Sequence, residues 1–197
     1  MKVIKNELDN LILKALNEHK ELLNIFDSKF IKEIINFSIL ISNTLKSQGT
    51  IFWCGNGGSA SDSQHFSAEL LGRFKKDRIP LKSVSLNTDL SLMTCIANDF
   101  GYENIFSRQI EGLGTNKDML IGISTSGKSV NVINAIKEAN GKGIQTLALL
   151  GNDGGEIINI ANHSIVIPSS NTARIQEMHT FIGHLLCELI EKELNLA

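Results

Sequence analysis

The first 48 residues carry apolar side chains at the spacing of a helix. Five of them recur three and four positions apart, as on one stripe of a helix: Ile4, Leu8, Leu11, Ile12 and Ala15. A second helix is predicted from Asp27, a favourable N-cap residue, to Gln48, because Gly49 ends the pattern. The chain is therefore expected to begin with two helices.

The apolar residues of the second helix extend well beyond one face: Phe30, Ile31, Ile34, Ile35, Phe37, Leu40, Ile41 and Leu45. A helix that is apolar nearly all round is buried on several sides. In a domain of this size we expect another subunit to provide part of that cover. The alternative is an ordinary core helix that lies beneath the first one.

After Gly49 the pattern changes to short, uninterrupted apolar runs, each closed by a glycine or a polar turn and followed by a helical pattern. The runs cover residues 50–54, 81–86, 119–123, 144–150 and 164–167. Such runs are typical of strands buried on both faces, and their alternation with helices indicates right-handed βαβ units. We predict an α/β fold, a three-layer αβα sandwich with a five-stranded parallel sheet, which ends in a long helix over about 172–194.

A length of 197 residues predicts a single domain over residues 1–197. Within it, residues 1–48 are interpreted as a helical extension that packs in the oligomer, and residues 49–197 as the α/β core. Lysine and arginine number 19 against 21 aspartates and glutamates, a net charge of −2. This balance gives no electrostatic reason to expect nucleic acid or an anionic membrane as a partner.

The three cysteines, Cys54, Cys95 and Cys187, are scattered and form no CxxC pair. Neither a disulfide framework nor a zinc–thiolate site is expected from them. The N-terminal segment meets a charge every few residues, and no run approaches the roughly 18 apolar residues of a membrane span. We expect a soluble, cytoplasmic protein.

Ligands of open parallel sheets bind beyond the carboxyl ends of the strands, so the loops after the strands are the expected ligand-binding segments. The first is the segment Cys-Gly-Asn-Gly-Gly-Ser-Ala at 54–60. Three glycines within four positions, with Asn56 and Ser59 beside them, let backbone N–H groups approach an anion at the start of a helix. The pattern favours a ligand loop over a tight turn, which one glycine could satisfy.

The second loop, Gly-Ile-Ser-Thr-Ser-Gly-Lys-Ser at 122–129, matches the nucleotide-binding pattern G-x-x-x-x-G-K-[ST]. However, no later apolar run ends in the acid that should hold magnesium, and Gly122 lies inside an apolar run. The remaining hydroxyl-bearing residues suit a phosphate monoester at a helix N-terminus without a metal. We therefore interpret this segment as a phosphate-binding serine loop.

His65 and Glu69 lie four residues apart on the helix after the first loop, so both point to one face. An imidazole and a carboxylate at this spacing can hold a divalent metal or transfer protons, although many such pairs are only solvated surface pairs. On the last predicted helix, Gln176 and His184 are eight apart, about 12 Å of rise and roughly 80° of rotation. Their roles stay open from spacing alone.

Taken together, these segments resemble the sedoheptulose 7-phosphate isomerase branch of the sugar isomerase (SIS) domain family. The resemblance covers nearly the whole chain and rests on Cys54 to Ser59, Gln64 to Phe66, Ala68 to Leu70, Gly72, Arg73, Asn98, Asp99, Ser124 to Ser129 and Ala173 to His179. It implies a flavodoxin-like SIS domain assembled as a homotetramer, with active sites at subunit interfaces. It also implies conversion of sedoheptulose 7-phosphate to D-glycero-D-manno-heptose 7-phosphate, the start of nucleotide-activated heptose synthesis for lipopolysaccharide or other surface glycans.

By the same resemblance, one zinc ion per subunit would be bound by His65, Glu69, Gln176 and His184. The sugar phosphate would contact Asn56, Gly57, Gly58, Ser59, Glu69, Asn98, Asp99, Ser124, Thr125, Ser126, Ser129 and Gln176. The reaction moves a proton between two carbons through an enediol and needs a base at carbon. We assign Glu69 as that base and His184 as its acid/base partner, with zinc as a Lewis acid.

A different class of function is represented by SIS proteins that have no catalytic activity and bind a bacterial replication initiator as tetramers. Those proteins resemble this chain in the loops but lack the equivalents of Glu69 and His184. Both residues are present here. The sequence therefore favours an enzyme.

Overall fold

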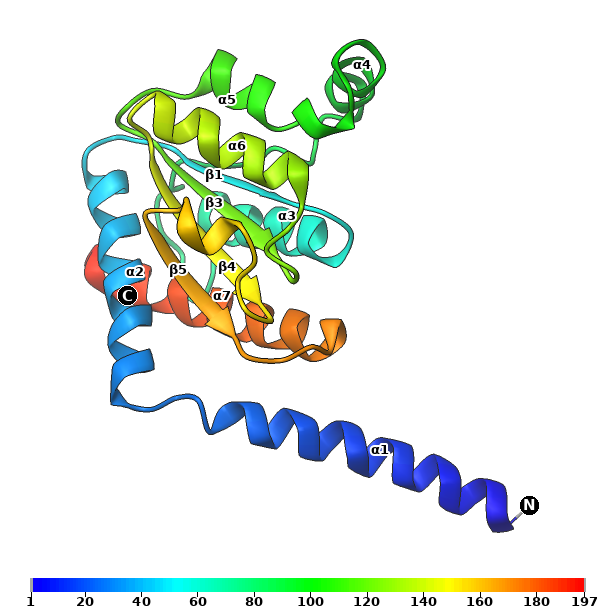
Figure 1. Ribbon diagram of the computed structural model, residues 1–197. Coiled ribbons are helices and arrows are strands. Elements are labelled where there is room, and N and C mark those ends of the chain that lie inside the picture. The colour runs from blue at the N-terminus through cyan, green and yellow to red at the C-terminus, as the bar shows by residue number, and fades with distance from the viewer. Residues whose placement is uncertain (1, 197) are drawn as a thin grey trace.

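The centre of the molecule is a five-stranded, fully parallel sheet in the order β2-β1-β3-β4-β5 (Figure 1). The computed structural model describes residues 2–196, with side chains from Asn6 onward. The strands are β1 (Ile51–Gly55), β2 (Ser83–Ser85), β3 (Met119–Ser124), β4 (Gln145–Gly151) and β5 (His163–Ile167). The predicted α/β class and strand number are confirmed.

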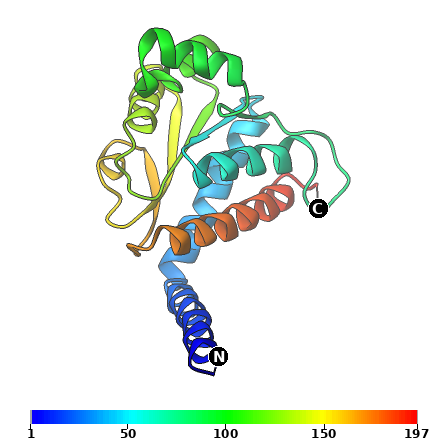
Figure 2. The ribbon, with the colours of Figure 1, turned by 90° about the vertical axis from the view of Figure 1, so that its right-hand side faces the viewer.

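Helices cover both faces of the sheet. The helices of the described residues are α1 (Lys2–Leu23), α2 (Ser28–Lys46), α3 (Gly58–Leu71), α4 (Leu90–Phe100), α5 (Ser107–Leu113), α6 (Val130–Gly141) and α7 (Thr172–Glu193), with short 3-10 helices η1 (Tyr102–Asn104) and η2 (Ile157–Asn159). One face packs against α2, α3 and α7, and the other against α4, α5 and α6 (Figure 2). Alternate strand residues enter the two cores: Ile51 and Trp53 face the first, Phe52 and Cys54 the second. This burial on both faces explains the uninterrupted apolar runs.

Helix α2 divides its apolar residues between the core and the surface. The Asp27 carboxylate caps its N-terminus and accepts hydrogen bonds from the N–H groups of Lys29 and Phe30, at 2.9 and 2.8 Å. One side of the helix enters the core through Ile34, Phe37, Ile41 and Leu45. The other side leaves Ile31, Ile35 and Ile39 exposed.

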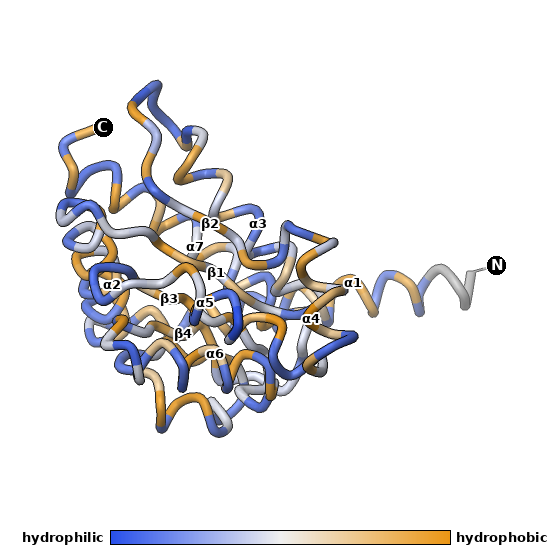
Figure 3. The backbone as a smooth tube through the Cα atoms, turned by 90° about the horizontal axis from the view of Figure 1, so that it is seen from above, coloured by the Kyte–Doolittle hydropathy of each residue, from blue (hydrophilic) through white to orange (hydrophobic). Residues whose placement is uncertain are grey.

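Helix α1 projects away from the sandwich (Figures 1 and 3). Five of its apolar side chains are more than half exposed: Leu8, Leu11, Ile12, Leu13 and Leu16. The side chain of Ile4, which the sequence assigned to the same stripe, lies outside the described residues. The C-terminal part of α1 meets the sandwich, where Arg174 donates a hydrogen bond to the carbonyl of Ala15 at 2.9 Å. Of the helices described, none is both long and apolar enough to cross a membrane.

The strand order changes direction between β1 and β3. From β1 the chain passes to β2 on one side, and then returns to β3 on the other. In open parallel sheets such a switch point opens a crevice at the carboxyl ends of the strands, where ligands bind. The loops after β1 and β3 are the two that the sequence selects as ligand loops.

Candidate functional site

The loop after β1, residues 55–58 (the glycine loop), leads directly into α3. Gly57 has φ +56° and open space around its α-carbon, a conformation that glycine adopts without strain. Asn87 fixes the start of the loop, because its side-chain amide donates to the carbonyl of Gly55 at 2.9 Å. The backbone N–H groups at the start of α3 are thereby held at the switch point.

Asn56 of the glycine loop is held by residues from the other side of the switch point. Its amide forms two reciprocal hydrogen bonds of 2.8 Å with the amide of Asn131, in the first turn of α6. The hydroxyl of Tyr102 donates to the side-chain oxygen Oδ1 of Asn56 at 2.9 Å. The sequence analysis missed Asn131 and Tyr102, although Asn131 follows the serine segment by only two positions.

The loop after β3, residues 124–129 (the serine loop), is tied by its own hydroxyl groups. The Ser124 and Ser129 hydroxyls lie 3.0 Å apart, and Ser124 Oγ also accepts from the N–H of Gly127 at 3.1 Å. Gly122 lies within β3, in register with Ala148, so it belongs to the strand and not to a nucleotide-binding loop. The lysine of that pattern, Lys128, is exposed. The hydroxyls of this loop lie at the N-terminus of α6, a position that is favourable for an anion.

Helices α3 and α7 approach each other closely beyond the glycine loop. Gly183 on α7 has no side chain, and the ring of Phe66 occupies the space that a Cβ would fill. This close approach brings the neighbouring side chains, His65 of α3 and His184 of α7, into contact, with their rings nearly perpendicular at 83°. Their Nε2 atoms lie 3.3 Å apart.

Glu69 completes a His–Glu–His cluster (His65, Glu69, His184). Its Oε1 lies 3.2 Å from Nε2 of His65, and the three ligand atoms all lie within 4.8 Å of one another. All three residues are partly buried. Sequence spacing predicted the first pair, and the packing of α3 against α7 adds the third member.

The donor set of the cluster fits a zinc ion. Two imidazole nitrogens and one carboxylate oxygen are ligands that zinc prefers, and a catalytic zinc site uses three of them and keeps one position open. With bonds of about 2.0–2.1 Å, neighbouring ligands of a tetrahedral ion are about 3.3 Å apart, close to both separations in the cluster. The third pair of ligand atoms, from Glu69 and His184, is within 4.8 Å, so these side chains would move together around a bound ion.

A buried carboxylate lies next to the cluster. Asp62, one turn before His65 on α3, accepts a hydrogen bond of 2.9 Å from the Thr180 hydroxyl, one turn before His184 on α7. Burial raises the pKa of Asp62, while the Thr180 hydrogen bond and the charges of His65 and His184 act in the opposite direction. The pair forms a second bridge between the helices, which the sequence analysis missed.

The other polar residues of α7 have separate environments. Gln176 lies against the first turn of α3, where a Cβ on Gly58 would collide with its side-chain amide. This contact is two turns before His65, so the structure does not bring Gln176 to the three cluster atoms. His179 is fully buried, its Nε2 is 2.9 Å from the carbonyl of Leu150, and burial lowers its pKa to about 4.

Three predicted substrate contacts remain apart from the cluster in a single chain. Asn98 and Asp99 are exposed on α4, and the Asn98 amide donates to the Asp99 carboxylate at 2.7 Å. Ser59 is buried in the first turn of α3, and its N–H donates to the carbonyl of Asn56 at 3.0 Å. In the described residues, none of these three side chains contacts the His–Glu–His cluster.

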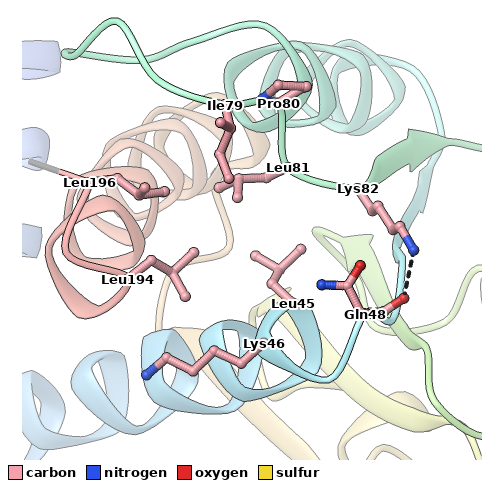
Figure 4. Close-up of a pocket in the computed structure, with 9 residues that line it drawn as sticks. All are labelled: Leu45, Lys46, Gln48, Ile79, Pro80, Leu81, Lys82, Leu194 and Leu196. Atoms are coloured by element: carbon pink, nitrogen blue, oxygen red, sulfur yellow. Dashed lines mark hydrogen bonds between the residues drawn. The ribbon is translucent and has the colours of Figure 1, made fainter.

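A pocket lies at the amino ends of β1 and β2, opposite to the carboxyl ends that carry the two loops (Figure 4). It is formed mainly by apolar side chains, including Leu45, Leu81 and Leu196. Lys82 at its rim donates from Nζ to the carbonyl of Gln48 at 2.9 Å. The pocket is remote from the switch point and contains none of the predicted site residues.

Comparison with known proteins agrees with this geometry. The family model of the SIS domain matches residues 16–151. The chain is 50% identical to the phosphoheptose isomerase of Helicobacter pylori over 186 residues, which cover 94% of this chain and 96% of that protein. It is 48% identical to phosphoheptose isomerase 1 of Campylobacter jejuni, over 93% of this chain and 98% of that protein.

A solved structure supports the same assignment. The phosphoheptose isomerase of Neisseria gonorrhoeae superimposes with a TM-score of 0.88 at 37% identity, over 94% of this chain and 99% of that one. Both the sequence and the fold are thus shared along nearly the full length. The chain is a member of the SIS domain family and belongs to its phosphoheptose isomerases.

Proposed function

We propose that this chain is an aldose–ketose isomerase that converts sedoheptulose 7-phosphate to D-glycero-D-manno-heptose 7-phosphate, the first step of nucleotide-activated heptose synthesis. The observation that carries the proposal is the His–Glu–His cluster, formed on a helix that begins at an anion-binding loop. The relatives named phosphoheptose isomerase, nearly identical in length, support the same activity.

The two parts of the site have different tasks in this proposal. The serine loop and the glycine loop bind the phosphate and orient the sugar, through Asn56, Gly57, Gly58, Ser59, Ser124, Thr125, Ser126 and Ser129. Asn98, Asp99 and Gln176 complete the substrate contacts. Because the phosphate is fixed at the sheet edge, the opposite end of the sugar extends toward α3 and α7.

The chemistry belongs to Glu69 and His184. Glu69 removes the proton from the carbon next to the carbonyl and returns it to the neighbouring carbon, which passes the sugar through an enediol. His184 exchanges a proton with the substrate oxygens during the same transfer. A zinc ion held by His65, Glu69 and His184 would supply Lewis-acid polarisation of those oxygens. Gln176 would be a further ligand of this ion only from the helix of a neighbouring subunit, because within one chain it lies against Gly58.

The same proposal includes a homotetramer whose active sites lie at subunit interfaces. Its support is the exposed apolar surface within residues 8–39, on α1 and on the outer side of α2, which one chain leaves uncovered. In this assembly residues 1–48 form the oligomer-packing extension of the 49–197 core, and the enzyme works in the cytoplasm. Sedimentation of the full chain tests the assembly, with Leu11→Lys expected to produce smaller species.

The activity is tested with sedoheptulose 7-phosphate as the substrate. Purified protein is incubated with the ketose before and after treatment with a chelator, and the aldose is detected by NMR. We expect conversion that is lost on chelation and restored by zinc. Failure of the zinc-loaded protein to form the aldose would overturn the proposal.

A further inference from the structure

The loop between α3 and β2, residues 72–82 (the crossing loop), is anchored to α7 by a buried ion pair. Arg78 of the loop and Glu191 of α7 have side chains that are each only 2% exposed, and Arg78 Nε lies 2.9 Å from Glu191 Oε1. The two residues are 113 positions apart. The pair therefore joins two distant parts of the chain inside the protein.

Arg78 also holds the last turn of α3. Its Nη2 donates to the carbonyl of Glu69 at 2.8 Å, and its Nη1 donates to the carbonyl of Leu70 at 2.7 Å. Carbonyls in the last turn of a helix have no partner within the helix, and a cation is favourable there. One guanidinium group thus fixes the backbone of Glu69 itself.

Glu191 holds the crossing loop over His184. Its carboxylate accepts from the N–H groups of Phe74 and Lys75, both at 3.3 Å, in addition to Arg78. The ring of Phe74 stacks on the ring of His184, with centroids 5.6 Å apart and an angle of 19° between the planes. Through Phe74, the same ion pair therefore also positions His184.

Stability alone does not account for this arrangement. Removing two charges from water is costly, and apolar side chains of similar volume often replace a buried ion pair without loss. Apolar residues could not bind the Glu69 carbonyl or the N–H groups that place Phe74. The ion pair provides directional bonds to both sides of the cluster at once.

We infer that Arg78, Glu191 and Phe74 are positioning residues for the isomerisation, which set the separation and orientation of Glu69 and His184 without contacting the substrate. The inference rests on the proposed function. Partners that orient metal ligands from outside typically change metal affinity or activity by about 10–100-fold when they are mutated. The phosphate-binding loops lie at the opposite end of α3 and at the start of α6, so phosphate binding is not expected to change with these residues.

The test compares Phe74→Leu, Phe74→Tyr and Glu191→Gln with the wild type. Lys137→Met is the control, because it removes an exposed ion pair with Glu156 on the other face of the sheet. For each variant kcat, KM and zinc affinity, measured by competition with a chromogenic chelator, are determined well below its unfolding temperature. A structural effect alone would lower the unfolding temperature without changing the zinc affinity or kcat of the folded protein.

We expect Phe74→Leu and Glu191→Gln to lower kcat and zinc affinity by about tenfold or more, with KM nearly unchanged. Phe74→Tyr, which keeps the ring, and Lys137→Met should behave as the wild type. Folded Phe74→Leu protein with wild-type kcat and zinc affinity would overturn the inference, and it decides the question even if Glu191→Gln does not fold. If the wild type does not isomerise the substrate, the proposed function fails, whereas zinc affinity still tests the positioning role.

Discussion

The serine loop and the His–Glu–His cluster are built in opposite ways. The serine loop comes from six consecutive residues, and its hydroxyls form hydrogen bonds with groups of those same residues. The cluster joins residues 119 positions apart, and it depends on the close packing of α3 against α7 at Gly183. Binding an anion needs only a local backbone shape, whereas the chemistry needs two helices at a fixed distance.

This difference predicts that the two regions can be damaged separately. Changes in the serine loop should weaken substrate binding, and changes in the cluster should slow the chemical step. His179 lies between the regions, because it binds the carbonyl of Leu150, the register partner of Ser124, from the helix that carries His184. The following predictions use this division.

The largest effect is expected for Glu69→Gln. The amide cannot accept the proton from carbon, and loss of a general base typically lowers kcat by about 10²–10⁴-fold. KM should remain close to the wild-type value because the phosphate loops are intact. Steady-state kinetics checks this, with the surface variant Glu156→Gln as a matched control, and a wild-type kcat in folded Glu69→Gln would remove the residue from the chemistry.

Ser124→Ala should act mainly on binding. The substitution removes the hydroxyl that holds both Ser129 and the Gly127 N–H. A hydrogen bond to a charged group contributes about 1.5–3 kcal/mol, so KM should rise by about 10–100-fold while kcat falls much less. Ser107→Ala, at the start of α5, is the control. An unchanged KM would show that the serine loop does not bind the phosphate.

His179 should make folding stability depend on pH. Burial lowers its pKa to about 4, whereas the unfolded side chain titrates near its ordinary value of 6.5. Between these values the unfolded state binds more protons, so stability falls as the pH is lowered from 7. His179 should lower the free energy of unfolding by about 2 kcal/mol between pH 7 and pH 5.

The His179 contribution is measured by urea unfolding at both pH values. Over this interval the free energy of unfolding of His179→Gln should fall by about 2 kcal/mol less than that of the wild type. The control His163→Gln changes an exposed residue, and its free energy of unfolding should change as in the wild type. The raised pKa of Asp62 contributes with the opposite sign, and it cancels in the comparison because all three proteins contain Asp62. Equal losses in wild type and His179→Gln would contradict the prediction.

The smallest effect is expected for Lys128→Ala. This exposed lysine completes the apparent nucleotide-binding pattern, but Gly122 lies in β3 and not in the loop. An exposed charge contributes up to about 1 kcal/mol, so KM should change by no more than about fivefold. A hundredfold loss would mean that the lysine binds phosphate as in a nucleotide-binding loop.

Sequence patterns predicted the regions whose contacts are local. The run 119–123 corresponds to β3 (Met119–Ser124), and the Asp27 cap begins α2. The run 81–86 is longer than β2 (Ser83–Ser85), because the N–H of Leu81 bonds to the carbonyl of Leu70 outside the sheet. The boundary was thus displaced where the residue before the strand binds the last turn of α3.

Spacing alone predicted only part of the cluster, whereas the resemblance to SIS isomerases named all three members as metal ligands. His65 and Glu69 share one helix, so spacing alone placed them together. His184, Asp62 with Thr180, and Arg78 with Glu191 meet through the packing of α3, α7 and the crossing loop, which no local pattern records. Within one chain Gln176 lies against Gly58, whereas His184 faces His65, so the predicted meeting of Gln176 and His184 at one metal ion stays a prediction.

The most direct test of the account is the isomerisation of sedoheptulose 7-phosphate in D₂O, followed by NMR for wild type and Glu69→Gln. If Glu69 transfers the proton, the aldose formed by the wild type should contain deuterium at C2. Glu69→Gln should form the aldose and exchange deuterium more slowly than the wild type. Aldose that contains no deuterium, formed equally fast by both proteins, would contradict the account.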